Sequence, residues 1–379
     1  MHELHATAAR AAIEAGSLTA RALVAACLAR IAERDRLLGA WAHVAGEAAL
    51  ARAEKLDAQR VHGALHGIPV GLKDVLDTLD MPTAHGSALY RGDIPARDAA
   101  CVTALRAAGA VVVGKTTTTE FASPIGVGVR NPHDFTRTPG VSSSGSAAAV
   151  ADFHVPVALG TQTGGSVIRP ASYCGIVGYK GDIDAFDLGG IRHVRLSLDA
   201  LGIFARSLAD IALVRRALGP RNAVPLVDES RATHPPRFAL CRTPEWGRAQ
   251  PSTRTAIEGA VTRLRDAGAA VAELELPAAF DRAYAAFGTI VVRETADAMS
   301  RELARRGSTP NAWLGEVASK ARSITDAEVR DAQHVAAACR AWLREAFDGC
   351  DAILTPAAAG EAPIDLHGPA DRRSPRCGR

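Results

Sequence analysis

Apolar residues recur at helical spacing in the first sixty residues of the chain. The clearest stripe consists of Leu23, Val24, Cys27, Leu28 and Ile31. Positions three and four apart lie on one face of an α-helix, so this stripe predicts a helix that packs against the core. Ser17 precedes it, and serine is a favoured residue at the N-cap of a helix. We therefore expect a helical segment over residues 1–60, with a helix capped by Ser17.

From about Gly67 the pattern changes to short apolar runs bounded by glycine and proline. Such runs cover residues 68–70, 110–113 and 155–159, and alanine-rich helical segments separate them. Short apolar runs of this kind are typical of buried strands. Their alternation with helices predicts an α/β fold.

A proline-bearing linker follows Leu218, and the alternation then resumes. We expect a strand over 237–241, a helix over 253–266 and a strand over 270–276, which continue the same sheet. The remaining expected elements are amphipathic helices over 278–306 and 325–347 and a strand over 351–354.

These patterns predict a mixed β-sheet core covered on both faces by α-helices. Four parts of the chain are expected: an N-terminal helical segment (1–60), a core with the candidate catalytic motifs (61–220), a C-terminal α/β part of the same fold (221–365) and a disordered tail (366–379).

Composition narrows the classes of function. The chain has 379 residues and a formal net charge of +3, with basic and acidic residues mixed along it, which disfavours nucleic acid or a membrane surface as a partner. No run approaches the 18 apolar residues of a membrane span, and the first five residues lack the pattern of a signal peptide. We expect a cytoplasmic protein.

The seven cysteines are scattered, odd in number and without metal-ligand spacing, so they imply neither disulfides nor a metal site. Cys174 lies beside a glycine-rich segment. It could be a catalytic thiol or a buried structural cysteine, and the second interpretation is favoured.

Residues 109–116 fit the P-loop pattern G-x-x-x-x-G-K-[ST]. Their β-branched centre instead predicts a strand, which excludes a phosphate-binding turn.

Three separated segments carry chemistry. The first, from Gly67 to Asp74, is an apolar run that ends in the single lysine Lys73. If this lysine is buried without a carboxylate partner, desolvation lowers its pKa and leaves a neutral amine that can act as a general base. The alternative is a lysine that extends its ammonium group to solvent.

The second segment is a turn that contains Ser142, Ser143, Ser144 and Ser146 and opens an alanine-rich helix. One serine is enough to cap a helix, so this excess favours a turn that points hydroxyl and backbone N–H groups into one pocket. A simple N-cap is the alternative.

The third segment runs from Gly160 to Pro170 and turns through Gly164 and Gly165 to Ser166. Paired glycines let a backbone approach a substrate closely, so that consecutive N–H groups can converge on a developing oxyanion. A tight turn without a catalytic role is the alternative.

Together these segments resemble the signature of the amidase signature family, over about residues 17–215. The family patterns are G-I-P-(hydrophobic)-x-(hydrophobic)-K-D, G-G-S-S-[SG]-G-S and T-Q-T-x-G-S-V-I-R-P. The flanking stretches 116–122, 131–132 and 174–178 resemble the family as well, and the spacing of the three segments agrees with it.

The resemblance implies an amidase that hydrolyses a carboxamide C–N bond, with the amidase signature fold and no cofactor or metal. Ser166 would be the nucleophile that forms the acyl-enzyme, Ser142 the relay and Lys73 the base. The implied oxyanion hole consists of the backbone N–H groups of Thr163, Gly164, Gly165 and Ser166.

The chain departs from the family pattern in three places, one of which is Lys180-Gly181-Asp182, where the family reads K-P-[TS]. Val141 stands where the family has glycine, next to a peptide bond that is cis in the family, and the sequence leaves open whether the Val141–Ser142 bond is cis. The family pattern also continues beyond the point that corresponds to Arg379. We therefore expect a truncated C-terminal part, with an apolar sheet edge that a partner would cover.

Three functions stay open at this stage: an amidase for a small-molecule amide, the glutaminase subunit of a tRNA-dependent amidotransferase, and a truncated, non-catalytic family member. The expected partner is a small-molecule amide substrate, without direct nucleic-acid or membrane contact. The sequence leaves the oligomeric state open, with a homodimer as one alternative. The sequence does not identify the amide.

Overall fold

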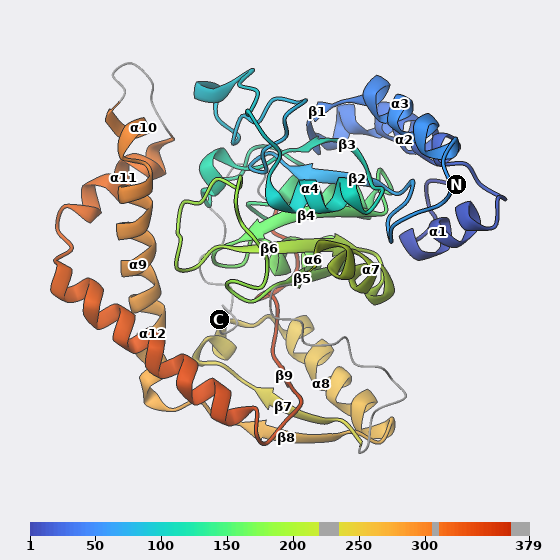
Figure 1. Ribbon diagram of the computed structural model, residues 1–379. Helices are drawn as coiled ribbons and strands as arrows, with labels where there is room; N and C mark the ends of the chain where they lie inside the picture. Colours follow the sequence, from blue (N-terminus) through green and yellow to red (C-terminus); the bar gives the residue numbers. More distant parts are fainter. Residues whose placement is uncertain (220–234, 305–310, 365–379) are drawn as a thin grey trace. The chain divides into compact units, whose positions relative to one another are not determined.

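The computed structural model describes residues 1–219, 235–304 and 311–364, and it has the α/β architecture that the sequence predicts (Figure 1). The described residues form two compact units. The first comprises residues 1–219 with 362–364, and the second comprises the described residues from 235 to 361. Most of the expected proline-bearing linker, and all of the expected tail over 366–379, lie outside the described residues.

The first unit contains a six-stranded sheet and its covering helices. Its helices are α1 (Ala6–Glu14), α2 (Ala20–Leu38), α3 (Gly46–Asp57), α4 (Ala100–Ala107), α5 (Ser144–Ala151), α6 (Ile168–Tyr173) and α7 (Leu208–Leu218), with 3₁₀ turns η1 (Ala88–Tyr90) and η2 (Glu120–Ala122). Its strands are β1 (Trp41–Val44), β2 (Pro69–Lys73), β3 (Val111–Thr116), β4 (Val157–Gln162), β5 (Val177–Lys180) and β6 (Ala200–Ala205).

The N-terminal region differs from the prediction in two details. The cap of α2 is Thr19, whose hydroxyl accepts a hydrogen bond from the N–H of Ala22, so the expectation of Ser17 is wrong. Ser17 instead follows α1 and donates to the carbonyl of Ala12. The short strand β1 interrupts the expected helices, because Trp41 and its neighbours pair with β3. The predicted stripe on α2 is buried except for Leu28, which is half-buried.

The order of strands is β1-β3-β2-β4-β6-β5. Strands β3, β2 and β4 are parallel, so their carboxyl ends meet at one edge of the sheet. Lys73 is the last residue of β2 and Gln162 the last of β4. This topology places two of the three motif segments side by side.

The two faces of the sheet belong to different cores. Val70 and Leu72 of β2 pack with residues of α4 and α7 in one core. Because side chains alternate along a strand, Gly71 and Lys73 point to the other face, where α5 and α6 pack. Helix α5 contacts β2, β3, β4 and β6, and all eight of its residues are buried. A helix without a solvent-facing side needs no polar stripe, which accounts for its serine, glycine and alanine composition.

Gly145 lets α5 lie against the carboxyl edge of the sheet. A Cβ atom on this residue would lie 2.4 Å from the carbonyl oxygen of Ala40 and 2.5 Å from the backbone nitrogen of Thr117. Its own N–H donates to the carbonyl of Thr117 at 3.0 Å. The helix that follows the serine turn is therefore fixed by backbone contacts, with no room for a larger residue.

The second unit has its own three-stranded parallel sheet, in the order β8-β7-β9. Its strands are β7 (Arg237–Cys241), β8 (Ala270–Leu274) and β9 (Ala352–Leu354). Its helices are α8 (Pro251–Asp266), α9 (Ala283–Ala298), α10 (Ser300–Ala304), α11 (Ala312–Ala321) and α12 (Asp326–Ala346), with 3₁₀ turns η4 (Pro244–Arg248) and η5 (Ala278–Arg282).

The expectation that these strands continue the first sheet is wrong, although their positions were predicted. Strand β7 pairs with β8 along one edge and with β9 along the other, so both of its hydrogen-bonding edges are filled within the second unit. Helix α11 was not predicted, and the expected helix over 278–306 is divided into η5, α9 and α10.

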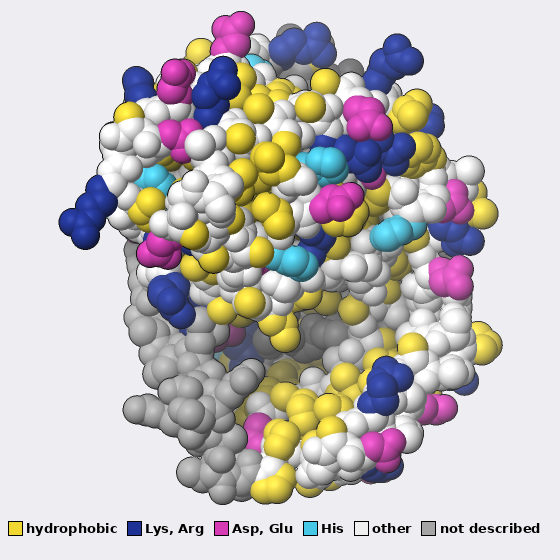
Figure 2. All heavy atoms as spheres, turned by 90° about the vertical axis from the view of Figure 1, so that its right-hand side faces the viewer, with side chains coloured by type: hydrophobic (Ala, Val, Ile, Leu, Met, Phe, Trp, Pro, Cys, Tyr) yellow, Lys and Arg dark blue, Asp and Glu magenta, His cyan; other side chains and the backbone are white. Residues whose placement is uncertain are grey.

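Charged side chains of both signs are mixed on one face of the protein. On the face shown in Figure 2, basic and acidic side chains of the described residues alternate without an extended field of one sign. Among the described helices, none is long and apolar enough to span a membrane.

We expect Gly145→Ala to lower the free energy of unfolding by about 3 kcal/mol, because the added methyl group overlaps three backbone atoms of Ala40 and Thr117 that cannot easily move. Urea denaturation of the purified variant measures this. Gly46→Ala is the matched control, since its Cβ would meet only the two methyl groups of Leu28, at 3.5 and 3.7 Å. Equal stability of the two variants would contradict the packing of α5 described above.

Candidate active site

Lys73 is fully buried at the carboxyl end of β2. Its Nζ atom lies 2.8 Å from Ser142 Oγ, 2.9 Å from Thr161 Oγ1 and 3.5 Å from the carbonyl oxygen of Thr161. Among the described residues, no carboxylate lies within hydrogen-bond distance of this amine. The structure thus favours the buried lysine over one that reaches solvent.

Burial lowers the pKa of Lys73 from 10.5 to about 7. Desolvation is the largest cause, since the charged ammonium loses its water without gaining a contacting anion. The negative charge of Asp199 raises the pKa, and the positive charge of Arg195 lowers it. An amine with a pKa near neutrality is suited to accept and return a proton.

Ser142 is held by its backbone as well as by Lys73. Its carbonyl oxygen accepts hydrogen bonds from the N–H of Thr119 at 3.4 Å and from Oγ1 of Thr118 at 3.2 Å. The Val141–Ser142 peptide bond is cis, which resolves the question that the valine raised. Ser142 itself is 1% exposed, so its hydroxyl is oriented in a dry environment.

The remaining serines of the turn do not cap α5. Ser143 Oγ donates to the carbonyl of Thr161 and accepts from its N–H, and Ser146 Oγ donates to the carbonyl of Leu159. Ser144 Oγ is buried and has no hydrogen-bond partner among the described residues. The N-cap Ser143 makes no side-chain capping bond, which excludes the simple N-cap interpretation.

Ser166 lies in the turn between β4 and α6. Gln162 closes this turn, because its Oε1 atom accepts from the N–H groups of Val167 at 2.8 Å and Ile168 at 3.0 Å. Ser166 is partly exposed, and its hydroxyl makes no hydrogen bond to a described residue. The structure therefore brings Lys73 and Ser142 into contact and leaves Ser166 accessible, without a hydrogen bond to either.

The four backbone N–H groups from Thr163 to Ser166 donate to no other described residue. Their segment is partly exposed, so the donors are available to a ligand. A Cβ on Gly165 would lie 2.5 Å from Nη2 of Arg169, so the turn has no space for a side chain there. Consecutive unpaired donors of this kind suit a developing negative charge.

Sequence reasoning missed Thr161, Arg195 and Asp199 as contributors to the site. Thr161 contacts Lys73 directly, and Asp199 accepts a hydrogen bond from Oγ1 of Thr163. The signals in the sequence were the position of Asp199 directly before an apolar run and the resemblance of residues 197–199 to the amidase signature family. This run forms β6, which pairs antiparallel with β4 and so brings Asp199 beside Thr163. The pairing belongs to the tertiary structure and cannot be read from the local sequence.

A second buried lysine, Lys115, lies on β3 within the segment that fits the P-loop pattern. Residues 111–116 form a strand, as the β-branched run predicts. Lys115 Nζ donates to the carbonyl of Leu76 and to Oγ1 of Thr83, both at 2.5 Å, and burial lowers its pKa to about 8. Its role is to hold the loop that follows Lys73.

Six cysteines lie in the described residues, and all of them are buried and free. Burial raises the pKa of the Cys174 thiol, which supports the structural interpretation of this residue. Among the described residues, no group of histidine, cysteine and carboxylate side chains is arranged to hold a metal ion.

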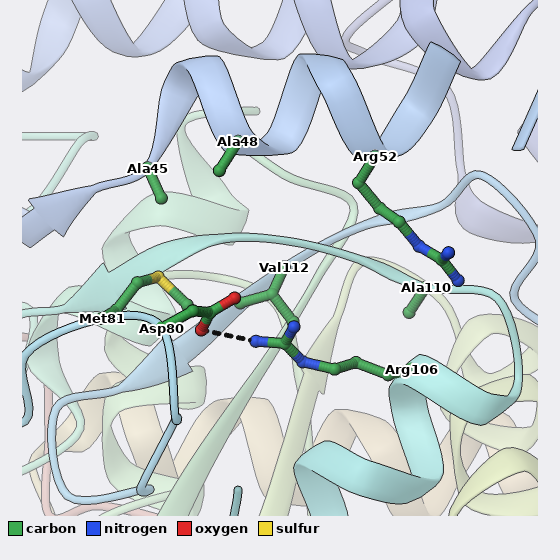
Figure 3. Close-up of a pocket in the computed structure, with 8 residues that line it drawn as sticks. All are labelled: Ala45, Ala48, Arg52, Asp80, Met81, Arg106, Ala110 and Val112. Carbon is green, nitrogen blue, oxygen red and sulfur yellow. Dashed lines mark hydrogen bonds and ion pairs between the residues drawn. The ribbon is translucent and has the colours of Figure 1, made fainter. Parts of the chain in front are cut away.

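A separate cavity lies between α3, α4 and the first half of β3 (Figure 3). It is lined by Ala45, Ala48, Arg52, Asp80, Met81, Arg106, Ala110 and Val112. Arg106 pairs with Asp80 at 2.7 Å and with Asp98 at 3.2 Å, so its charge is balanced within the protein. The cavity lies away from the carboxyl end of the strands, where Lys73 and Ser142 meet.

Comparison with known proteins finds a family model and curated relatives that are similar to this chain. The family model described as Amidase matches residues 22–373. The chain is 39% identical, over 303 residues, to the glutamyl-tRNA(Gln) amidotransferase A subunit of Chloroflexus aggregans. That alignment covers 73% of this chain and 61% of the relative, so the chain spans about three fifths of the length of that curated relative.

Solved structures have the same fold as this chain. A crystal structure of an amidase superposes with a TM-score of 0.87 at 30% identity, covering 95% of this chain and 83% of that one. The native peptide amidase from Stenotrophomonas maltophilia superposes with a TM-score of 0.79 at 30% identity, covering 98% and 87%.

We expect the stability difference between the wild-type protein and Lys73→Met to depend on pH. Because the folded pKa of Lys73 is about 7 and its ordinary value is 10.5, unfolding takes up a proton between these two values. The free energy of unfolding of the wild-type protein, relative to that of the variant, should therefore rise by about 1.4 kcal/mol per pH unit between pH 7 and pH 10.5. Below pH 7 this difference should not change with pH.

Urea denaturation between pH 6 and pH 9 measures this difference. Replacing the exposed Lys55 by methionine is the control, which should give a curve parallel to that of the wild-type protein. Parallel curves for Lys73→Met and the wild-type protein would show that Lys73 is not buried as a neutral amine.

Proposed function

The chain belongs to the amidase family, and from this membership we propose that it hydrolyses the C–N bond of a carboxamide through an acyl-enzyme on Ser166. The observation that carries the proposal is the contact at 2.8 Å between the buried, carboxylate-free amine of Lys73 and the hydroxyl of Ser142. The unpaired N–H groups of residues 163–166 support it, because acyl transfer requires donors for an oxyanion.

In the first half of the reaction, Ser166 Oγ attacks the carbonyl carbon of the amide. Its proton moves to Ser142 Oγ while the Ser142 proton moves to Lys73 Nζ, so that the relay ends with an ammonium ion. The carbonyl oxygen becomes an oxyanion that accepts from the N–H groups of residues 163–166, and the loss of one such donor typically costs about 3 kcal/mol. Hydrogen bonds that are absent without substrate commonly form in the substrate complex, as expected for Ser142 and Ser166.

In the second half, the C–N bond breaks and the leaving nitrogen takes the proton back from Lys73 through Ser142. A water molecule then attacks the acyl-enzyme, and the same relay takes up its proton. The carboxylic acid leaves and Ser166 regains its hydrogen. Lys73 thus does the work that histidine does in other serine hydrolases.

The proposed substrate is a small-molecule amide, without direct contact to nucleic acid or a membrane. The small net charge and the mixed surface of Figure 2 support this part of the proposal. The free cysteines among the described residues support the cytoplasm as the compartment. We propose a homodimer as the assembly, which sedimentation measures directly.

A second candidate is the glutaminase subunit of a tRNA-dependent amidotransferase. The curated relatives are named as A subunits of glutamyl-tRNA(Gln) amidotransferase, and such a name implies other chains. In this case the ammonia released from glutamine would pass to a partner chain. The chemistry at Ser166 is the same in both candidates.

We expect Ser166→Ala, Ser142→Ala and Lys73→Ala each to lower amide hydrolysis about a thousandfold or more, because members of one relay act as a unit. Covalent modification by a fluorophosphonate, located by peptide mass spectrometry, tests the same assembly without a known substrate. The adduct should appear on Ser166 in the wild-type protein. The exposed Ser17→Ala variant is the control and should react like the wild-type protein.

An unchanged rate in Ser166→Ala would exclude the proposed nucleophile. A folded wild-type protein that is never modified at Ser166 would instead favour the non-catalytic family member.

The two candidate functions differ in the amide that is cleaved. For the stand-alone amidase, we expect the isolated chain to release ammonia from simple carboxamides. For the glutaminase, we expect release from glutamine and co-purification with a tRNA-binding chain. Ammonia assays with both substrates, with Ser166→Ala as the blank, decide between the candidates.

A further inference from the structure

We infer that the side chains of Thr163 and Asp199 are positioning groups, whose hydrogen bond fixes the direction of the N–H groups of residues 163–166. The bond is a property of the structure. Its consequence for the reaction rests on the proposed function, and the two can be measured separately.

The turn that carries Ser166 has few bonds of its own. Gly164 and Gly165 have no side chains and a wide choice of backbone conformations. The N–H groups of residues 163–166 donate to no described residue. The shape of this turn therefore depends on side chains that hold its two ends.

Gln162 holds the far end of the turn, where its Oε1 atom accepts from the N–H groups of Val167 and Ile168. The two glycines lie between this bond and Thr163. Because a glycine pair transmits little restraint along the backbone, the near end requires a bond of its own.

Asp199 supplies the bond at the near end. Strands β4 and β6 are antiparallel, and their pairing ends with Gln162 opposite Ala200. The next position brings Thr163 beside Asp199, and one carboxylate oxygen accepts from Oγ1 of Thr163. This side-chain bond continues the pairing of the two strands by one residue. It therefore acts at the residue whose N–H begins the row of unpaired donors.

The carboxylate of Asp199 is itself fixed. Its second oxygen accepts from the N–H groups of Val194 at 3.1 Å and Arg195 at 3.0 Å. The N–H of Asp199 donates to the carbonyl of Arg195 at 2.8 Å. Asp199 is only 9% exposed, so water competes little for these bonds. A carboxylate bonded through both oxygens is a rigid point of attachment for the Thr163 hydroxyl.

The loop over residues 190–199 is also tied to the strand of the base. The N–H of Arg192 donates to the carbonyl of Val75 at 3.0 Å, and Val75 follows Lys73 by two residues. The loop that holds Thr163 is thus bound to the segment directly after Lys73. This arrangement keeps the row of donors in a set position relative to the base.

The hydroxyl of Thr163 has a second polar neighbour. Nη1 of Arg195 lies 3.4 Å from Oγ1 of Thr163, so the oxygen accepts from Arg195 while its hydrogen is donated to Asp199. A hydroxyl that both donates and accepts has one orientation. Valine has nearly the shape of threonine and can do neither, whereas serine can do both.

The direction of the donors matters for the chemical step more than for binding. Donors that already point at the developing oxyanion need no reorientation in the transition state. The side chains of Thr163 and Asp199 bond to each other and to the loop, and their assigned action runs through the backbone of the turn. Loss of the bond should therefore lower the maximal rate and leave substrate affinity nearly unchanged.

The test uses the modification of Ser166 by a fluorophosphonate, measured against reagent concentration to separate the maximal rate from the apparent affinity. We expect Thr163→Val to lower the maximal rate about ten- to a hundredfold, which approaches the effect of losing one oxyanion donor. The apparent affinity should stay within about twofold of the wild-type value. Thr163→Ser keeps the hydroxyl and should recover most of the lost rate.

Asp199→Asn tests the other side of the bond, because its amide nitrogen cannot accept from the N–H groups that hold the carboxylate. We expect it to lower the maximal rate as Thr163→Val does. In the double variant, Thr163→Val should change this rate by less than about threefold, since both substitutions remove one bond. Independent, multiplicative losses overturn the inference. If Asp199→Asn does not fold, the comparison of Thr163→Val with Thr163→Ser decides.

Thr78→Val is the matched control. It also removes a fully buried threonine hydroxyl, which donates to the carbonyl of Met81 at 3.2 Å outside the turn. Its maximal rate should equal that of the wild-type protein. An equal loss in Thr78→Val and Thr163→Val would show a general effect of losing a buried hydrogen bond, and would overturn the inference.

Hydrogen exchange of the peptide that covers residues 162–169, followed by mass spectrometry, needs no reaction at Ser166. We expect faster exchange at Val167 and Ile168 in Thr163→Val than in the wild-type protein or Thr163→Ser, because one end of the turn is released. Faster exchange in a protein whose Ser166 is never modified supports the positioning bond and excludes the proposed chemistry. Modification of wild-type Ser166 with an unchanged maximal rate in Thr163→Val supports the chemistry and overturns the inference.

Discussion

The site depends on one constraint: an amine is buried at the end of a strand without an anion in contact with it. Water cannot stabilise the ammonium form there, so the neutral form becomes accessible near pH 7. The strands, the helix and the polar groups around Lys73 keep water and charge away from its amine. Strands β3 and β4 enclose β2 on both sides, and α5, with its small residues, seals the face of the sheet to which Lys73 points. The polar atoms within reach are hydroxyl and carbonyl groups, which can exchange hydrogen bonds with an amine without carrying a charge.

Local chemistry made much of this arrangement predictable. The β-branched run at 111–113 predicted a strand even within a P-loop pattern, because β-branched side chains favour extended backbone. The excess of serines at 142–146 predicted more than a helix cap, and the structure shows three of them bonded to the lysine or to strand backbone. The glycine pair at 164–165 predicted backbone donors that are open to a ligand, and these N–H groups are unpaired among the described residues.

What the sequence did not predict depends on pairing between distant segments. The contribution of Asp199 follows from the register of β6 against β4, which no local pattern encodes. The same holds for β7, whose apolar run is compatible with either sheet until its neighbours β8 and β9 are known. Ser17 and Thr19 are both good capping residues, and the position at which α2 packs on the core decided between them. Local propensities therefore identified elements such as β3 and β7, whereas the partners of these strands required the tertiary structure.

The chain uses lysine sparingly, with five lysines among 44 basic residues, and two of the five are inside the protein. Reagents that acylate amines meet the α-amino group and the remaining three lysines, of which Lys55 and Lys320 are exposed and Lys180 is half-buried. Coupling of the protein to an activated ester resin or a dye would therefore join it through a few defined points. The buried amine of Lys73 would be spared, so that a tethered preparation keeps the contact between Lys73 and Ser142.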